Sequence, residues 1–370
     1  MEYTFKALEK LILGITGPDA EAAEEARKRQ AKLAKPPGSL GRLEELSVQL
    51  AAITGRVKNR FDKKALLVFC ADNGVVCEGV AATPQSVTAA QTVNLARGKT
   101  GAAVLARQFG AEVRVCDVGV NAKICEPGVI DRKIAFGTNN IAAGPAMTKE
   151  QAVRAILTGA ELAIGAAREG VQVIGAGEMG IGNTTTSSAV VSVLLNLPAR
   201  DVTGRGAGLT DEAYAKKIEV VERAVRINRP DADDVIDVLA KVGGFDIAAM
   251  CGAFIGAAFA RIPAVIDGFI SAAAALCAVR LCENVRTFLI PSHASFEKAF
   301  GAIMNALGAR PMFDFGMRLG EGSGCPLAMA VLDAANAVMN DMATFGEAEI
   351  NDSYLEPLRG IDAFTAGVDP

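Results

Sequence analysis

Short apolar runs alternate with longer segments of helical periodicity over most of the chain. The strand-like runs are KALLVFCAD, AEVRVCDVGV, VQVIGAGE, the start of AVIDGFISAAAALCAVRL and the LIP stretch within NVRTFLIPSHAS. Helical segments follow them, such as VTAAQTVNLARGKTGAAVLARQFG and MTKEQAVRAILTGAELAIGAAREG. In the second, Thr148 and Gln151 have the spacing of a capping box. Apolar strands alternating with helices predict an α/β fold with a parallel sheet covered on both faces.

The first 58 or so residues have a different pattern, and helices are predicted there without strands. Glu21 to Ala34 is charged and alanine-rich, and Leu43 to Ile53 has apolar spacings near three and four. Between them, Pro36-Pro37-Gly38 is a helix stop, and Ser39 or Gly41 can begin the next helix. The N-terminal part is therefore expected to be a helical appendage.

The amino-acid composition limits the classes of protein to which this chain can belong. The chain has 370 residues, of which 51% are apolar and 22% charged, as in well-packed globular proteins with room for two domains. The net charge of −4 is spread without a basic stripe, which argues against a nucleic-acid partner. The alanine- and glycine-rich stretch from Ile247 to Val279 is interrupted by Arg261, Pro263 and Asp267, so buried elements are predicted rather than a membrane span.

The cysteines and the single histidine indicate the cellular compartment and limit the kinds of catalytic chemistry that are possible. The eight cysteines form no CxxC pair, and several lie in apolar runs, which favours buried reduced thiols. The N-terminus has no secretory signal pattern, so a cytoplasmic location is expected. His293 is the single histidine, which excludes a histidine-rich metal site, and it can equally be a structural side chain. No metal and no cofactor are expected.

Two lone glutamates lie in glycine clusters far apart in the sequence. Glu178 is in VIGAGEMGIGNTTTSSAVV, which reads as strand, loop and helix, and Glu321 is in GMRLGEGSGCP. Ligands of parallel sheets bind beyond the carboxyl ends of the strands, and the segments that follow predicted strands are Asp72-Asn73-Gly74, Glu178, Asp267-Gly268 and Pro291-Ser292-His293. The two acids are therefore predicted to form two walls of one site, although a turn with a solvated acid remains the alternative for each.

The motif GAGEMG from Gly175 formally matches the dinucleotide fingerprint GxGxxG. That function requires an acid roughly 20 residues later at the end of a strand, where only LNLPARD occurs. An ionised Glu178 within the loop would also repel a pyrophosphate. A dinucleotide-dependent dehydrogenase is therefore disfavoured.

A single phosphate suits the same region better. Asn183 and Thr184 open a helix after glycines, and free amides at a helix N-terminus bind anions. The loop TGRGAGLTDE opens another helix, with Arg205, Lys216 and Lys217 nearby. Lysine can hold a phosphate as a point charge, although each lysine can also belong to a solvated face.

Seven motifs together resemble one family. KPPGSLGRLEEL, ADNGV, GEMGIGNTT, GRGAGLTDE, GGFDIAAMCGAFIGAA, PSHAS and DFGMRLGEGSG occur in this chain. They have the order found in nicotinate-nucleotide–dimethylbenzimidazole phosphoribosyltransferases, which make the lower-ligand nucleotide of cobalamin. The resemblance runs from about Lys35 to Thr344.

The resemblance implies an architecture and a reaction. It implies a three-layer α/β/α domain with a parallel sheet over residues 61–330, a smaller helical domain from residues 1–60 and 331–370, and a homodimer. The reaction joins nicotinate mononucleotide and a benzimidazole-type base to give the α-ribotide and nicotinate. The pyridinium nitrogen of the substrate is already cationic, so it can leave without a metal.

The resemblance also implies roles for residues of this sequence. Glu321 takes the proton of the attacking base, and Glu178 faces the ribose as positive charge develops at C1′. The implied substrate-binding residues are Thr83, Gln91 and Leu319 for the base, Gly180, Gly182, Asn183, Thr184, Gly204, Arg205, Gly206, Gly208 and Lys217 for the phosphate, and Ser295.

Two departures leave the preferred base open. Asn73 and Phe300 stand where the family usually has histidines, and both are interpreted as changes at the rim of the base pocket. A broad benzimidazole-type range is expected. A phenol-type enzyme, one subunit of a mixed assembly, and a nucleotide-binding module without activity remain alternatives.

Overall fold

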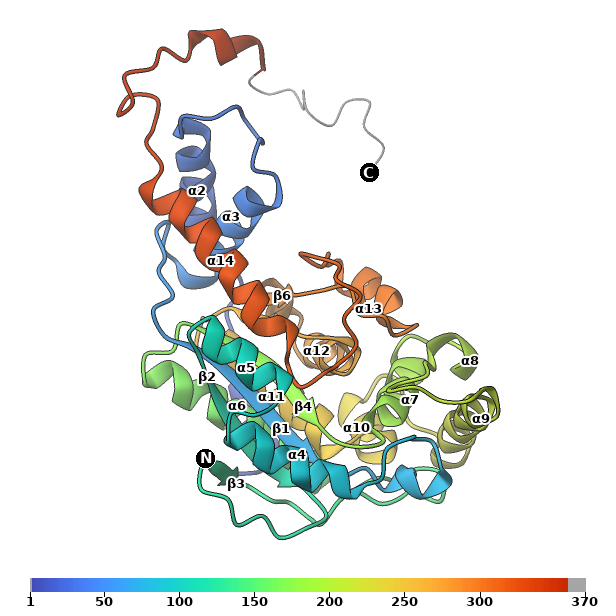
Figure 1. Ribbon diagram of the computed structural model, residues 1–370. Helices are drawn as coiled ribbons and strands as arrows, with labels where there is room; N and C mark the ends of the chain where they lie inside the picture. The colour runs from blue at the N-terminus through green and yellow to red at the C-terminus, as the bar shows by residue number, and fades with distance from the viewer. Residues whose placement is uncertain (1, 359–370) are drawn as a thin grey trace. The chain divides into compact units, whose positions relative to one another are not determined.

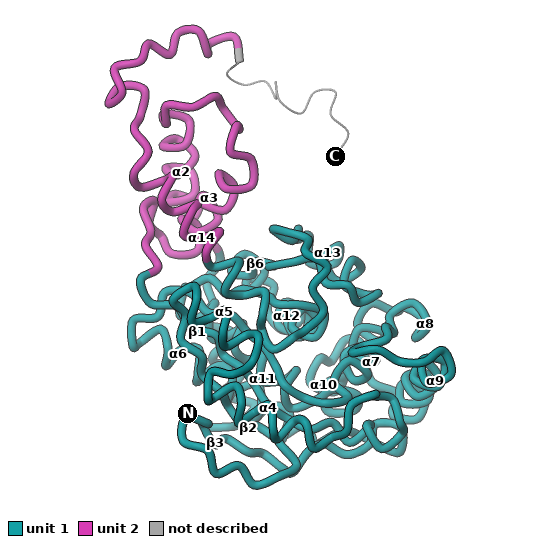
Figure 2. The backbone as a smooth tube through the Cα atoms, in the orientation of Figure 1, with its two compact units in different colours: residues 1–17, 62–329 teal, residues 18–61, 330–370 magenta. Residues whose placement is uncertain are grey.

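The computed structural model describes residues 2–358, which fall into two compact units (Figure 2). One consists of residues 1–17 and 62–329, and the other of residues 18–61 and 330–370. Residues 1–17 thus belong to the first unit, whereas the predicted helical domain begins at residue 1. The hydroxyl of Tyr3 donates to Glu161 of this unit at 2.7 Å, which explains the difference. Residues 359–370 of the predicted C-terminal part lie outside the described residues.

The first unit contains a six-stranded sheet in the order β3-β2-β1-β4-β5-β6. Every neighbouring pair is parallel. The strands are β1 (Lys64–Ala71), β2 (Ala111–Gly119), β3 (Val129–Asp131), β4 (Val173–Met179), β5 (Ala264–Ile266) and β6 (Leu289–Pro291). The parallel α/β fold predicted from the sequence is confirmed.

Helices cover both faces of this sheet (Figure 1). They are α1 (Phe5–Leu13), α4 (Ser86–Ala96), α5 (Gly101–Gln108), α6 (Lys149–Arg168), α7 (Asn183–Leu194), α8 (Ala199–Val202), α9 (Asp211–Asn228), α10 (Val235–Val242), α11 (Phe245–Phe259), α12 (Phe269–Leu281) and α13 (Phe300–Leu307), with short 3-10 turns η1 (Gly74–Glu78) and η2 (Glu283–Phe288). Helices α4 and α5 lie on one face, and α6 and α11 lie on the other (Figure 1). The capping box of Thr148 and Gln151 at the start of α6 is confirmed.

The strands form because their side chains are buried on both faces. In β1, the seven residues from Ala65 to Ala71 are all buried, as a central strand with helices on both sides requires. The single helix predicted from Val87 to Gly110 is wrong, because the chain breaks between α4 and α5. Gly98 has a left-handed φ of 70°, and Thr100 then caps α5 by accepting from the Ala103 amide.

The second unit is helical and has a small apolar core of its own. It contains α2 (Ala20–Lys32), α3 (Arg42–Thr54), the later part of α14 (Gly324–Asp341) and the 3-10 turn η3 (Ser353–Leu358). Ala22, Ala26, Ala51 and Met339 are buried together, with Val48 and Val57 packed against them. The chain between α2 and α3 is held by an ion pair of Lys35 and Glu44 at 2.6 Å.

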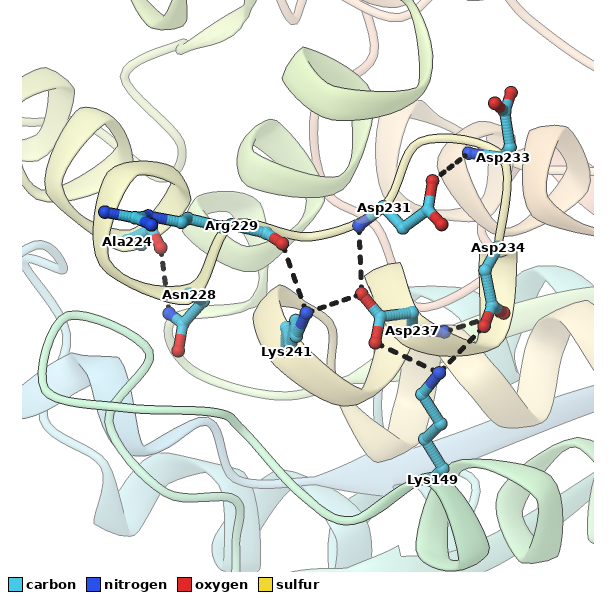
Figure 3. A network of polar contacts seen from close by, with 9 residues as sticks. All are labelled: Lys149, Ala224, Asn228, Arg229, Asp231, Asp233, Asp234, Asp237 and Lys241. Carbon is cyan, nitrogen blue, oxygen red and sulfur yellow. Dashed lines mark hydrogen bonds and ion pairs between the residues drawn. The ribbon is translucent and has the colours of Figure 1, made fainter.

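An ionic network joins the start of α6 to α10 and the preceding loop (Figure 3). The Asp237 carboxylate, 6% exposed, accepts from the Asp231 amide at 2.9 Å and pairs with Lys149 at 3.1 Å and Lys241 at 2.8 Å. Burial raises the pKa of Asp237, but the bonds from Lys241, the Asp231 amide and Lys149 outweigh it, so the pKa lies below its usual value.

Asp237→Asn is expected to lower the free energy of unfolding by about 1–2 kcal/mol at pH 7, because it weakens hydrogen bonds to a charged group. The carboxyl pKa is about 3.9 in the unfolded chain and lower in the folded protein, so the ionised group stabilises the folded state at pH values above about 3.9. This stabilisation is lost as the pH falls through the lower pKa of the folded state. Denaturation at pH 7 and at pH 3 should therefore show a smaller difference from wild type at pH 3. Exposed Asp233 supplies the control Asp233→Asn, expected to be neutral, and equal losses in both variants would contradict the account.

No helix within residues 2–358 is long and apolar enough to cross a membrane. The same residues contain no group of three or more His, Cys, Asp or Glu side chains placed to hold a metal ion.

Candidate active site

A pocket opens beyond the carboxyl ends of β4, β5 and β6, where ligands of parallel sheets bind. Its lining comes from loops far apart in the sequence, which the parallel sheet brings to one edge. The lining residues are Val80–Thr83, Glu178–Thr184, Arg205–Ala207, Leu209, Lys217, Asp267–Ser271, His293, Ser295, Glu297 and Arg318–Gly320. The prediction that ligand-binding groups follow the strands agrees with this arrangement.

Glu178, near the end of β4, is a buried carboxyl group among other acids. It accepts a hydrogen bond from the Asn183 amide nitrogen, which also donates to Asp246 at 2.9 Å. Burial, followed by the nearby Asp246 carboxylate, raises the pKa of Glu178 to about 8. The pKa of Asp246 is itself raised to about 6 by burial. Burial and the neighbouring acids thus disfavour the ionised form of Glu178 in the free protein.

Lys217 provides a buried cation in the lining of the same pocket. Its Nζ donates to the Thr184 hydroxyl at 2.8 Å and to the Gly204 carbonyl at 3.0 Å. Burial lowers the pKa of Lys217 to about 8, which leaves most of the group charged at pH 7. Thr184 is in the first turn of α7, whose dipole and free amides also favour an anion. These groups form a corner suited to a phosphate.

Glu321 is 2% exposed and has an unusual backbone conformation. Its φ is 61°, between Gly320 at 81° and Gly322 at 82°, and a non-glycine residue in this region costs about 1–2 kcal/mol. Its carboxylate accepts from Gln91 Nε2 at 3.3 Å and from the Ala102 amide at 3.3 Å. Ala102 is in the first turn of α5, so the helix dipole stabilises a negative charge on Glu321.

Glycines in β4 let the Glu321 loop lie directly on the strand. A Cβ at Gly177 would lie 2.5 Å from the Gly322 nitrogen and 2.7 Å from the Glu321 carbonyl carbon. A Cβ at Gly175 would lie 2.5 Å from the Cβ of Cys325. Two of the three glycines of the apparent fingerprint, Gly175 and Gly177, therefore serve packing between a strand and a loop. A Cβ at Gly320 would lie 2.7 Å from Glu178 Oε1, so the residue before Glu321 packs directly against the Glu178 carboxyl group.

Most residues predicted for the site line one pocket. Those in its lining are Glu178, Thr83, Gly180, Gly182, Asn183, Thr184, Arg205, Gly206, Lys217, Ser295 and Leu319. Gln91 and Glu321 lie outside this lining and bond each other, and Gly204 binds Lys217 through its carbonyl. Gly208 closes a turn by donating to the Arg205 carbonyl at 3.1 Å. Arg205 itself bonds Leu209 and Asp211 within its own loop.

The interpretation of Asn73 and Phe300 as rim residues is wrong. Asn73 is fully buried and donates to Asp246 at 3.5 Å, and Phe300, 4% exposed, is the first residue of α13. Neither lines the pocket. The exposed apolar side chains nearby are instead Phe296 and Leu319, both on segments that reach the pocket. Burial of a position between loops depends on tertiary packing, which the motif order does not reveal.

Of three further acids at or beside the pocket, Asp246 and Glu297 were not predicted to belong to the site, whereas Asp267-Gly268 was expected at the ligand-binding edge of the sheet. Asp246 shares Asn183 with Glu178, and a lone acid in the first turn of the apolar helix α11 was a signal for it. Glu297 lines the pocket, and its Oε2 is buried without a hydrogen-bond partner among the described residues. Asp267, directly after β5, contacts the Glu321 loop, and no local sequence pattern indicates that contact.

Comparison with known proteins defines the class. Residues 15–350 match the DBI_PRT family, described as a phosphoribosyltransferase. A nicotinate-nucleotide–dimethylbenzimidazole phosphoribosyltransferase of Ruminiclostridium cellulolyticum is 51% identical over 342 residues, which cover 92% of this chain and 97% of the relative. The enzyme of the same name from Clostridium tetani is 47% identical over 353 residues, covering 95% and 98%.

A solved structure agrees with both sequence matches. The crystal structure of CobT from Thermus thermophilus has a TM-score of 0.87 and 42% identity, and the match covers 90% of this chain and 99% of that chain. This chain belongs to the DBI_PRT family of phosphoribosyltransferases. The resemblance noted from the motifs is confirmed, and the protein is an enzyme of the pentosyltransferase class.

Proposed function

We propose that this enzyme transfers the phosphoribosyl group of nicotinate mononucleotide to 5,6-dimethylbenzimidazole or a similar base. The products are the α-ribotide, used to assemble the nucleotide loop of cobalamin, and nicotinate. The observation that supports this most strongly is the combination of a phosphate corner at Lys217 with two buried glutamates, Glu178 and Glu321, whose segments pack against each other. The names of the relatives support the same reaction.

The nucleotide would bind with its phosphate at Lys217, Thr184 and the glycine loop from Gly204 to Gly208. The ribose would then lie near Glu178. A cationic pyridinium ring beside this carboxyl group favours its ionised form, because opposite charges stabilise each other at short range. Ionised Glu178 would stabilise the positive charge that develops at C1′ when nicotinate leaves.

The incoming base would approach beside exposed Leu319 and lie between Thr83 and Gln91. Its nitrogen attacks C1′ from the face opposite the pyridinium ring, so the bond to nicotinate breaks as the new bond forms and the β configuration becomes α. The N–H of the base becomes acidic as it bonds, and Glu321 would take this proton. Gln91 and the Ala102 amide hold the two oxygens of Glu321 in place for that step.

We further propose that the protein is a cytoplasmic homodimer, and that its α/β unit carries the catalytic groups while the helical unit forms a smaller domain. Eight free cysteines fit a reducing compartment. The phosphate, ribose and base groups named above all come from the first unit.

Competition between two bases tests both the reaction and the base class. Purified protein with nicotinate mononucleotide is expected to release nicotinate only when a base is present. With equal concentrations of 5,6-dimethylbenzimidazole and p-cresol, the benzimidazole ribotide should predominate, because a phenol oxygen with a pKa near 10 attacks poorly before it loses its proton. Product identification by mass spectrometry gives the ratio.

Each other outcome identifies an alternative. Predominant phenolic riboside would show a phenol-type enzyme. Binding of nicotinate mononucleotide without nicotinate release from any base would favour a nucleotide-binding module or one subunit of a mixed assembly.

A further inference from the structure

Asp267 binds the backbone of the loop that carries Glu321. Asp267 follows β5 directly, and its carboxylate accepts from the Gly322 amide at 3.1 Å through Oδ2 and from the Gly324 amide at 2.7 Å through Oδ1. Gly322 is the residue immediately after Glu321. Both oxygens of one buried side chain therefore hold the segment that contains the proposed base.

Asp267 is itself fixed to the sheet. It is 3% exposed, and its amide donates to the Ser271 hydroxyl at 3.2 Å, which in turn donates to the Ala176 carbonyl of β4 at 2.8 Å. The Ser292 hydroxyl after β6 donates to the Asp267 carbonyl at 3.1 Å. Strands on both sides of β5 thus set the position of its carboxylate.

Burial outweighs the groups around Asp267 that favour its ionised form, so the pKa of Asp267 lies above its usual value. Burial raises the pKa of Asp267, while His293, whose Nδ1 lies 3.9 Å from Oδ1, and the Gly324 and Gly322 amides lower it. An ionised carboxylate accepts both amide hydrogens, whereas a neutral acid or amide cannot accept both equally well.

The loop needs such a restraint because it has few side chains of its own. Gly320, Gly322 and Gly324 lack side chains that could pack, and Glu321 has a left-handed φ that an unrestrained chain would leave. Hydrogen bonds to the backbone amides of this loop therefore add to the bonds of Gln91 and Ala102 in holding Glu321 at one position. A displacement of about 1 Å of a catalytic group can lower a rate about 100-fold.

We propose that Asp267 is a positioning residue. By binding the amides of Gly322 and Gly324, it keeps the Glu321 carboxylate at the position from which it can accept the proton of the base. This inference rests on the proposed function, because it requires Glu321 to be the group that takes the proton. Asp267 also lines the pocket, but both of its carboxylate oxygens accept loop amides, so the action assigned to it is exerted through Glu321.

The test compares four variants: Asp267→Asn, Glu321→Gln, the double variant and Asp237→Asn. Asp237 is a matched control, since it is also a buried aspartate that accepts a backbone amide, in the ionic network of Figure 3. Asp267→Asn is expected to lower kcat about 10–100-fold and to leave the Kd for nicotinate mononucleotide within about 2-fold of wild type. Asp237→Asn should lose stability but keep kcat.

The double variant separates positioning from a general structural role. If Asp267 acts through Glu321, the double variant should be no more than about 2-fold slower than Glu321→Gln alone, because the group being positioned is already gone. Full multiplication of the two effects, or a wild-type kcat in Asp267→Asn, would overturn the proposal.

Folding is checked by thermal denaturation of each variant. If Asp267→Asn does not fold, Asp267→Glu keeps the charge and displaces the two acceptor oxygens by one methylene, and the same cycle is measured with it. If neither variant folds, Asp267 acts in stability and the proposal is wrong. A wild-type protein that releases no nicotinate would instead contradict the proposed function, which keeps the two failures distinct.

Discussion

Glu321→Gln is expected to lower turnover at least about 100-fold, the range for loss of a general base, with nearly unchanged binding of nicotinate mononucleotide. Glutamine keeps the shape of the side chain and cannot accept the proton of the attacking base. Glu321 lies outside the lining of the nucleotide pocket, so removal of its charge should leave the phosphate corner intact. Steady-state nicotinate release gives kcat, and calorimetric titration gives the Kd of the nucleotide.

Glu349→Gln supplies the matched control for this substitution. Glu349 also has a left-handed φ, of 54°, but it is exposed and belongs to the helical unit. Because Glu349 has no proposed catalytic role, this variant measures only the effect of replacing Glu by Gln at a residue with a left-handed backbone. If Glu321→Gln turns over at the wild-type rate, Glu321 is not the base.

Lys217→Ala is expected to raise the Kd of nicotinate mononucleotide about 10–100-fold and to affect the KM of the base much less. The change removes a charged donor whose hydrogen bond to a phosphate is worth about 1.5–3 kcal/mol. The bonds of Lys217 to Thr184 and Gly204 hold its Nζ beside the N-terminus of α7, so the cation is already in place when the nucleotide arrives.

Lys216→Ala is the control, because Lys216 is the exposed neighbour on the same helix α9. It should bind the nucleotide as the wild type does. Titration of both variants decides the assignment: an unchanged Kd in Lys217→Ala, with weaker binding in Lys216→Ala or Arg205→Ala, would move the phosphate contact to that residue.

Much of the fold was predictable because its strands are continuous apolar runs. A strand buried on both faces, such as β1, must be apolar along its whole length, and that pattern is visible in KALLVFCA. The three-residue edge strand β3 was missed, because VID is only partly buried and ends in an exposed acid, so no apolar run marks it. The break between α4 and α5 had local signals in Gly98 and Thr100, but the apolar spacing on both sides masked them.

The site was predictable where residues follow strands, and not where contacts cross between distant loops. Glu178 lies near the end of β4 and the Asn183-Thr184 helix start follows this strand, as the strand-loop-helix pattern indicated. The partners of Glu321 are Gln91 and the Ala102 amide, more than two hundred residues earlier in the chain, and no local pattern connects them. Asn73 shows the same limit, since its burial against Asp246 arises from packing between separate helices and loops.

The anomeric configuration of the product tests the central claim most directly. Wild-type protein is incubated with nicotinate mononucleotide and 5,6-dimethylbenzimidazole, and proton NMR follows the C1′ hydrogen while nicotinate is quantified in the same sample. The account predicts one equivalent of nicotinate for each α-ribotide of dimethylbenzimidazole, because attack from the opposite face inverts C1′. A β-ribotide, or nicotinate released with free ribose phosphate whether or not the base is present, would contradict it.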